Sequence, residues 1–273
     1  LFYMKFSVLL SVYIKEQPAY LRQALESVFS QTLPPDEVVL VEDGPLTDEL
    51  SAVVGEFAHR YPALKVVPLD TNHGLGYALN IGLGHCTHEL VARMDTDDVC
   101  KPNRFEVQVA FMDSHPDVDI VGSWIDEFLD NTGNVVSIRK VPESHQTIVK
   151  YGKMRNPMNH PTVMFRKEAL LRVGSYKPFM LLEDYYLWAR MIVSGCKFHN
   201  LQQSLLFFRL SRDIYRRRGG YNYAITEVKF QKELRRIGYL SKYQVVINIL
   251  NRFFIRIMPV SLRGFVYKRC LRK

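Results

Sequence analysis

Short apolar segments alternate with amphipathic segments through the first hundred residues of this chain, and this alternation constrains the fold more than any other sequence feature. The apolar segments are continuous and β-rich, which is typical of strands buried on both faces. The amphipathic segments place apolar residues at helical spacing. We expect strands at residues 5–13, 37–41, 64–69 and 90–94, and helices at 18–31, 47–60 and 76–83. This pattern predicts an α/β fold, a doubly wound and mostly parallel sheet flanked by helices, whose ligands bind beyond the carboxyl ends of the strands.

The rest of the chain is predicted to complete this domain and then to form a separate tail. We expect a helix at 105–114, a strand at 118–125, a hairpin turn at 130–134 and a helix at 182–194, while residues 135–180 are less regular. Gly219 and Gly220 are the best candidate for a linker. We therefore predict one domain at 1–210, with halves at about 1–100 and 101–210, and a basic helical tail at 211–273.

The fourth predicted strand ends in three clustered carboxylates, Asp95, Asp97 and Asp98. A buried strand cannot continue into such acids without solvent or a cation to compensate their charge, so the cluster marks the end of the strand. One interpretation is a site for a hard divalent cation, and the other is a solvated acidic turn that caps the next helix. Tyr13 and Asp43 also fall at predicted strand ends, and this convergence favours the metal site.

Two other phosphate-binding motifs fit the sequence less well. Three glycines between residues 74 and 82 look like a dinucleotide-binding loop, but Leu79 occupies the place of the third glycine and the loop follows the third strand, not the first. Asp95 and Asp97 also fit the start of a haloacid-dehalogenase-like phosphatase. That class needs its motif after the first strand, together with a later acidic pair, and neither is found. We keep the phosphatase as an alternative.

Six ordered motifs, taken together, resemble family 2 of the inverting glycosyltransferases, which are nucleotide-sugar enzymes of the GT-A fold. The resemblance covers about residues 5–210. The motifs read SVY at 11–13, EDGP at 42–45, NHGLGYALNIGL at 72–83, MDTDD at 94–98, NHPTVMFR at 159–166 and EDYYLW at 183–188. The sequence departs from the usual family pattern at Ile14, Glu42, Pro45 and Leu79, so contacts that the family makes at those positions are not carried over.

The resemblance implies a donor site built from the first three motifs. Ser11, Tyr13 and Asp43 would lie against the base and ribose of a nucleoside diphosphate, commonly uridine. Asn72 and Asn80, from the third motif, would add substrate contacts. The implied donor is a nucleotide sugar, and a UDP-sugar in particular.

The later motifs imply the reaction. Asp95 and Asp97 would form a DXD element that binds ribose and a Mn²⁺ or Mg²⁺ ion, with Asp98 close by against the substrate. Such an ion neutralises charge on the departing diphosphate. Asp184 would take the proton of the acceptor hydroxyl during in-line attack, which inverts the anomeric carbon. Glu183 would support that base or bind the acceptor, although two acids in a first helical turn also suit the helix dipole without any catalytic role.

Other residues of these motifs have structural interpretations. His160 would contact substrate, but a turn histidine with a structural role fits the motif equally well. Trp188 could stack on a sugar, and we expect it in the core instead. We interpret Met154, Met158 and Met164 as packing residues.

Charge is distributed unevenly along the chain. Residues 209–273 contain 17 lysines and arginines against 3 acids, whereas residues 1–208 contain 19 against 25. A basic tail can bind nucleic acid or an anionic membrane, and no nucleic acid is expected because no recognisable binding module accompanies the charge. Residues 245–258 predict an amphipathic helix with Asn248, Arg252 and Arg256 on one polar stripe. The helix would lie on an anionic membrane or dock on the first domain. The alternative from another functional class is a non-catalytic protein that uses this basic tail to bind a membrane or nucleic acid.

The cysteines and the start of the chain predict the compartment. Cys86, Cys100, Cys196 and Cys270 are scattered, as in reduced cytosolic proteins, and no signal-like segment is evident near residue 1. Enzymes of the family that the chain resembles often build bacterial surface polysaccharides on lipid carriers. We therefore expect a cytoplasmic enzyme, peripheral on the inner face of the cell membrane, with a glycan or lipid-linked glycan as acceptor.

Overall fold

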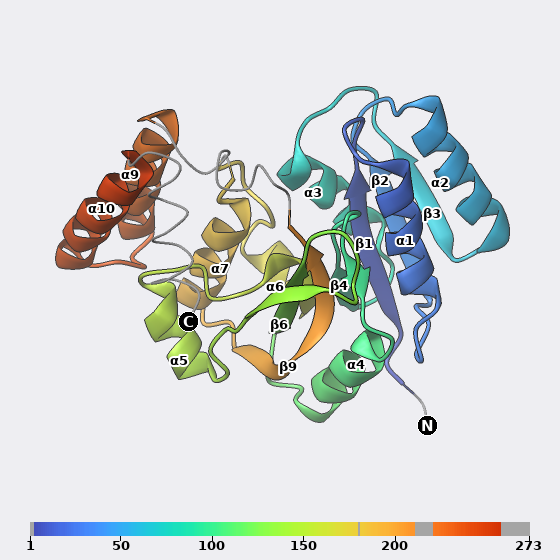
Figure 1. Ribbon diagram of the computed structural model, residues 1–273. Helices are drawn as coiled ribbons and strands as arrows, with labels where there is room; N and C mark the ends of the chain where they lie inside the picture. The colour runs from blue at the N-terminus through green and yellow to red at the C-terminus, as the bar shows by residue number, and fades with distance from the viewer. Residues whose placement is uncertain (1–2, 180, 211–220, 258–273) are drawn as a thin grey trace.

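The computed structural model describes residues 3–179, 181–210 and 221–257, and Figure 1 shows a central sheet with helices on both faces. Its first strands are β1 (Phe6–Val12), β2 (Glu37–Glu42), β3 (Leu64–Pro68) and β4 (Leu90–Arg93). They are parallel and lie in the order β3-β2-β1-β4. The predicted α/β class is confirmed. The candidate linker at Gly219 and Gly220 and the basic residues after 257 lie outside the described residues.

Antiparallel strands enter the sheet beyond β4. The short strand β8 (Met164–Arg166) pairs antiparallel with β4 and with β6 (Ile120–Phe128), and β9 (Phe198–Arg209) runs parallel to β6. β5 (Val99–Cys100) pairs with β9, and β7 (Val135–Arg139) forms the predicted hairpin with β6. A strand as short as β8 is too brief to show a periodic signal in the sequence.

Alternate residues of β1 pack under different helices. Val8 and Leu10 lie in a core with α1 (Pro18–Phe29), α2 (Asp48–Arg60) and α4 (Arg104–Ser114). Leu9 lies in the other core with α3 (Leu75–His85), α6 (Lys167–Arg172) and α7 (Glu183–Val193). Because successive side chains of a strand point to opposite faces, a strand covered on both sides must be apolar throughout. This requirement explains the continuous apolar run at residues 5–13.

Two further helices, α9 (Tyr221–Arg236) and α10 (Lys242–Ile257), lie side by side at the left of Figure 1. They share an apolar cluster with α7, in which the Phe230 ring packs against Tyr185 and Tyr186. The described part of the predicted tail is therefore helical and docked on the protein. Nowhere among the described residues does a helix reach the length and apolarity needed to cross a membrane.

The sequence places Asn248 on a polar stripe of α10, and the structure shows that this position faces the protein. Its side chain is buried, and its amide donates to the carbonyl oxygen of Lys153 at 2.8 Å and to Gln231 Oε1 at 2.9 Å. Helical spacing separates two faces but does not decide which of them contacts protein. Here the hydrogen bonds of one buried amide fix the rotation of α10, since an unpaired buried amide would be costly. The side chains of Arg252 and Arg256 lie outside the described residues.

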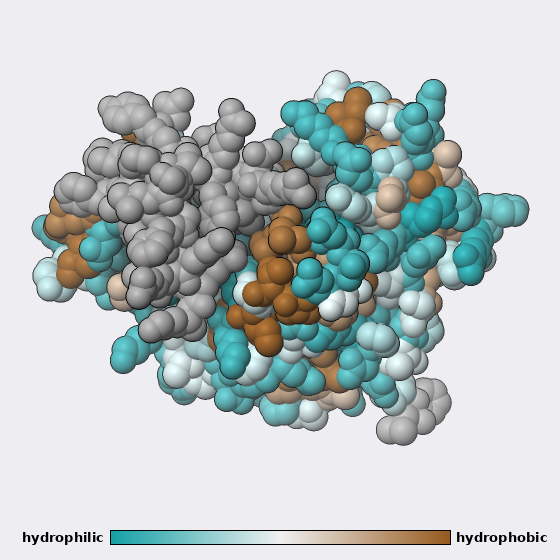
Figure 2. Space-filling model, in the orientation of Figure 1, coloured by the Kyte–Doolittle hydropathy of each residue, from teal (hydrophilic) through white to brown (hydrophobic). Residues whose placement is uncertain are grey.

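The apolar residues of α10 consequently divide between two faces. Val245 is buried against α9, whereas Tyr243, Val246 and Leu250 are 75%, 56% and 54% exposed. Apolar surface over this helix pair is visible at the left edge of Figure 2. Part of the predicted apolar face is therefore open to solvent.

Candidate active site

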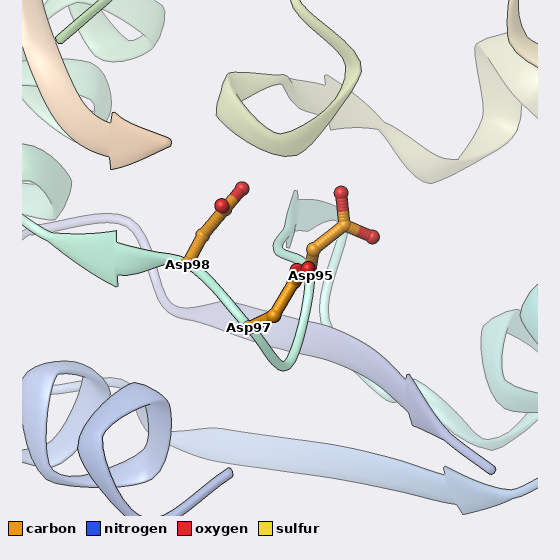
Figure 3. Close-up of side chains that lie close together, drawn as sticks. All are labelled: Asp95, Asp97 and Asp98. Atoms are coloured by element: carbon orange, nitrogen blue, oxygen red, sulfur yellow. The ribbon is translucent and has the colours of Figure 1, made fainter. Parts of the chain in front are cut away.

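The three aspartates predicted as a cluster lie together in the turn between β4 and β5 (Figure 3). Asp95, Asp97 and Asp98 can each offer a carboxylate oxygen so that the three oxygens lie within 4.8 Å of one another. The strand ends at Arg93, where the chain turns before the acids begin. This turn stands at the carboxyl end of a parallel strand, which is the end where ligands bind in such sheets.

Burial and mutual repulsion act on the ionisation of the cluster. The pKa of Asp97 is raised to about 7, first by burial and then by the charges of Asp95 and Glu16. Burial, followed by the charges of Asp97 and Asp95, raises the pKa of Asp98 well above its usual value. Asp98 Oδ1 accepts a hydrogen bond from the backbone N–H of Arg209 at 2.9 Å, but its buried Oδ2 has no partner among the described residues. A buried carboxylate oxygen without a donor, within a converging set of carboxylates, fits a hard divalent cation.

Two charged residues of this site were absent from the sequence-based prediction. The buried guanidinium of Arg93 donates to both carboxylate oxygens of Asp95, one of them at 2.8 Å, and so fixes the first acid of the cluster. Glu16 follows β1 and accepts a hydrogen bond from Thr96 Oγ1 at 2.9 Å, and burial raises its pKa. The sequence does carry a signal for Arg93, because a cation inside an apolar strand requires a nearby acid. Glu16 gives no such signal, since it reaches the cluster only through tertiary structure.

Asp43 is held firmly at the carboxyl end of β2. Its carboxylate accepts hydrogen bonds from Asn72 Nδ2 at 3.0 Å and from the backbone N–H groups of His73 at 2.8 Å and Gly74 at 2.9 Å. Gly44 permits this close approach, because its φ is +85° and a Cβ there would lie 2.7 Å from the backbone nitrogen of Asn72. The Asn72 amide therefore positions Asp43, and its contact with substrate stays a prediction.

The other predicted donor contacts differ in accessibility. Ser11 is half-buried near the end of β1, and Tyr13 is 40% exposed just beyond it. Asn80 is engaged on both sides, because its Nδ2 donates to the carbonyl oxygen of Tyr176 at 2.8 Å and its Oδ1 accepts from the N–H of Tyr176 at 2.9 Å. The Asn80 amide holds the loop after α6, and its role toward substrate stays a prediction.

Asp184 and Glu183 begin α7, as the sequence predicts. Asp184 Oδ2 accepts a hydrogen bond from Asn156 Nδ2 at 2.6 Å, and its Oδ1 accepts from the N–H of Tyr185 at 2.7 Å. These donors orient the carboxylate and leave further lone pairs for a hydroxyl group. Burial raises the pKa of Glu183, which faces the start of α3, where a Cβ on Gly76 would lie 3.5 Å from Glu183 Cγ. Asn156 was not predicted, because it lies in the irregular segment without a periodic signal.

A buried tyrosine hydroxyl is paired with His160. Tyr176 Oη lies 2.8 Å from His160 Nε2. Burial raises the pKa of Tyr176, Arg93 opposes this, and the charges of Asp184 and Asp95 raise it further. Burial, with the charge of Arg93, lowers the pKa of His160 well below its usual value, so the neutral ring suits this structural contact, and its role toward substrate stays a prediction.

The aromatic and methionine residues of the motifs lie mostly in the core. Trp188 is fully buried, as expected, and so are Met158 and Met164. Met154 is instead 55% exposed, so the prediction that it packs inside is wrong. It follows α5 (His145–Gly152) in a loop, where no periodicity fixes the direction of a side chain.

Similarity to known proteins covers most of the chain. The family model described as Glycosyl transferase family 2 matches residues 7–174. The UDP-Gal:alpha-D-GlcNAc-diphosphoundecaprenol beta-1,3-galactosyltransferase of Escherichia coli is 45% identical over 98% of this chain and 97% of its own length. The amylovoran biosynthesis glycosyltransferase AmsE of Erwinia amylovora is 42% identical over 97% of this chain and 98% of its own length. The crystal structure of S. aureus TarS 1-349 in complex with UDP-GlcNAc matches with a TM-score of 0.67 and 22% identity. The match covers 98% of this chain and 77% of the TarS 1-349 chain, and this likeness confirms the predicted GT-A fold.

Proposed function

The chain belongs to glycosyl transferase family 2 and is a glycosyltransferase, and from this premise we propose that it transfers galactose from UDP-galactose to a lipid-linked N-acetylglucosamine diphosphate. The E. coli relative, named for this donor and acceptor, aligns along nearly the whole chain. The relative named for amylovoran biosynthesis supports a place in the synthesis of a bacterial polysaccharide. Family membership displaces the phosphatase and the non-catalytic alternatives, and the aspartate turn follows β4, whereas the phosphatase motif requires the first strand.

The observation that supports this function most directly is the aspartate turn, because Asp95, Asp97 and Asp98 converge at the carboxyl end of β4 with carboxylate oxygens within 4.8 Å of one another. Asp184 stands at the start of α7, where Asn156 and the N–H of Tyr185 donate to its carboxylate. A transferase needs a group that stabilises the leaving diphosphate and a base that activates the acceptor on two sides of one sugar, and the aspartate turn and Asp184 would supply them. Tyr13 and Asp43, at the ends of β1 and β2, would then hold the uridine.

Asp95, Asp97 and Asp98 would hold a Mn²⁺ or Mg²⁺ ion, and the partnerless Oδ2 of Asp98 supports this assignment. When bound, such an ion supplies Lewis-acid stabilisation of the leaving diphosphate. Arg93 would keep Asp95 oriented whether or not donor is bound, since the pair is buried on the arginine side. Fixed charges of this kind need no reorganisation during the reaction.

Asp184 would act as the general base. As the acceptor oxygen bonds to the anomeric carbon, its proton passes to Asp184, and the bond from that carbon to the diphosphate oxygen breaks with its electron pair, releasing UDP. Attack from the face opposite the leaving group inverts the anomeric carbon, so an α-linked donor gives a β-linked product. The Asn156 and Tyr185 donors would hold the carboxylate in position for this step.

The protein would meet its acceptor at the membrane surface. The tail at 211–273 carries 16 lysines and arginines, and each one near an anionic leaflet contributes about 1 kcal/mol. The exposed residues Tyr243, Val246 and Leu250 of α10 offer an apolar contact on the same part of the chain. We therefore propose peripheral association with the inner face of the membrane.

The test is transfer in vitro to an acceptor of the proposed chemistry. The protein is incubated with Mn²⁺, UDP-galactose and N-acetylglucosamine α-linked to an alkyl diphosphate, and the product and released UDP are measured. UDP-glucose and UDP-N-acetylglucosamine are tested in parallel, and the Asp184→Asn variant is the control for contaminating activity. We expect a galactosylated product from the wild type alone. No product from any of these donors would contradict the proposal, and a product from another donor only would correct the sugar.

A further inference from the structure

An open groove of about 240 Å³ lies between α5 and α10, away from the aspartate cluster. Its lining residues come from both helices and from the loop after α5: Lys150, Lys153, Met154, Gln244, Ile247 and Asn248. The surface is mostly apolar, with lysines on the α5 side. A groove of this size is smaller than a site for a drug-sized ligand, and it suits one end of a longer molecule.

The loop that forms one wall of the groove also reaches the candidate base. The carbonyl oxygen of Lys153 accepts the hydrogen bond from Asn248 of α10, and three residues later Asn156 donates to Asp184. Three residues span at most roughly 10–11 Å. Tyr185 Oη also donates to the carbonyl oxygen of Gly152 at 2.6 Å, which ties the end of α5 to the start of α7. The groove therefore opens within a few residues of the base, at a separation that a sugar and a diphosphate can bridge.

The wall of the groove is positively charged. Residues 150–155 read KYGKMR, with three cations and no acid. The Lys153 ammonium is already committed, because it donates to the carbonyl oxygen of Tyr239 and lies 3.8 Å from the centre of that ring. Lys150, which lines the groove, and Arg155, which follows the lining residue Met154 in the sequence, are exposed. These two are the cations that remain open to an anionic ligand, and phosphate is an anion that both side chains bind well.

The groove continues into apolar surface on α10. Ile247 lines the groove and lies one helical turn from both Tyr243 and Leu250, which are exposed. A chain leaving the groove past Ile247 would cross this exposed stripe before reaching solvent or a bilayer. A polar ligand would gain nothing from such a stripe, whereas an isoprenoid chain would bury apolar area on it.

We propose that the α5–α10 groove binds the diphosphate and the first isoprene units of the lipid-linked acceptor, with Lys150 and Arg155 on the diphosphate and with Met154 and Ile247 against the lipid. This inference rests on the proposed function, because it takes the acceptor to be a lipid diphosphate. It assigns the lipid to a site on the acceptor side of Asp184, separate from the donor cluster. The sugar of the acceptor would then extend from the groove toward Asp184.

The first experiment measures binding without catalysis. Farnesyl diphosphate carries the two recognised groups but no sugar, and isothermal titration calorimetry compares it with inorganic diphosphate and with farnesol. We expect the wild type to bind farnesyl diphosphate more tightly than either fragment. Lys150→Glu should weaken this binding at least about tenfold, the effect of losing one charged hydrogen bond. Met154→Ser should weaken binding of farnesyl diphosphate and leave that of inorganic diphosphate unchanged.

The control variant is Arg60→Glu, which makes the same charge change at the exposed end of α2, and Figure 1 shows α2 on the opposite side of the protein from α5 and α10. It should bind farnesyl diphosphate as the wild type does. Unchanged binding in both groove variants would overturn the proposal, and so would an equal loss in Arg60→Glu, which would indicate a response to net charge alone.

The second experiment separates this site from the proposed function. Transfer is measured with the N-acetylglucosamine alkyl diphosphate and with methyl N-acetylglucosaminide, which has neither diphosphate nor lipid. Lys150→Glu should raise KM for the first acceptor at least about tenfold and leave KM for UDP-galactose unchanged. Transfer with an unchanged acceptor KM would refute the groove while the proposed function stands. Binding of farnesyl diphosphate without any transfer would refute the proposed function while the groove stands.

Discussion

Removing one charge from the aspartate cluster should stabilise the protein without metal and destabilise it with metal. The pKa of Asp97 is raised from 3.8 to about 7, first by burial and then by Asp95 and Glu16. The folded protein therefore binds this proton more tightly than the unfolded chain does, so ionisation of Asp97 opposes folding. The cost grows as pH rises from about 4 to about 7 and is complete above that range. Asp97→Asn abolishes it.

The size of this effect follows from the difference between the usual pKa of Asp97 and its pKa in the folded protein. At 1.36 kcal/mol per pH unit, the difference between 3.8 and about 7 corresponds to an upper limit of about 4 kcal/mol. Asp97 is partly exposed, and water relieves part of the repulsion, so we expect about 2 kcal/mol. For a chain of this size, each kcal/mol moves Tm by about 2–4 °C. In EDTA at pH 8, Asp97→Asn should therefore melt about 4–8 °C above the wild type, and this advantage should vanish as pH falls toward 4.

Metal should reverse the order of the two proteins. At a Mn²⁺ concentration one hundred times its Kd, binding stabilises the wild type by about 2.7 kcal/mol, whereas the variant loses a ligand and gains little. Differential scanning fluorimetry with EDTA and with Mn²⁺ measures both effects. The matched control is Asp113→Asn, the same substitution on an exposed position of α4, which should respond to neither. A variant less stable than the wild type in EDTA at pH 8 would refute the reasoning, because Asp97 would then stabilise the fold through its contacts.

Four further results are expected. Asp184→Asn should lower kcat by about 10²–10⁴ and leave the Kd of UDP unchanged by calorimetry, and unchanged turnover would exclude this residue as the base. NMR of the product from an α-linked donor should show a β-anomeric proton, and an α signal would contradict direct displacement. Replacing Tyr243, Val246 and Leu250 by serine should reduce sedimentation with anionic liposomes at low salt, and equal sedimentation would place membrane contact elsewhere. Burial acts to raise the pKa of Glu37, but hydrogen bonds outweigh it and lower the pKa to about 2; Glu37→Gln should lower Tm at pH 7, and the difference should shrink between about pH 5 and pH 2.

The donor half of the site was predictable because its physical requirements leave traces in short stretches of sequence. A doubly covered strand must be apolar throughout, so β1 and β4 could be recognised together with their ends. Parallel strands bring those ends to one edge of the sheet, which is why Asp43 and the Asp95 cluster could be related before their positions were known. Burial of clustered acids is costly enough that the cluster itself indicated a ligand.

The orientation of α10 could not be predicted from local sequence patterns. Spacing identified both faces of α10, but Asn248 decides which side docks. Its amide donates to a carbonyl oxygen of the loop after α5 and to a glutamine of α9. Those partners lie 95 and 17 residues away in the chain. No local pattern encodes such a pairing. A buried polar contact between distant segments can therefore override an apolar stripe that looks like the natural interface.

The acceptor half of the site, around Asp184, was also hard to predict from local patterns. The cause bears on which acceptor the enzyme would select. Its key groups, Asn156 and Tyr176, are neutral, and they stand in irregular segments between residues 135 and 182, where no period constrains them. Neutral hydrogen bonds can be rearranged between related enzymes at a small cost in stability, whereas a charged cluster that binds metal and diphosphate cannot. We therefore expect the donor half to keep one arrangement of charge among related enzymes with different acceptors. The segment from α5 to α7, which joins the groove to Asp184, is free to vary, and it is there that the choice of acceptor should reside.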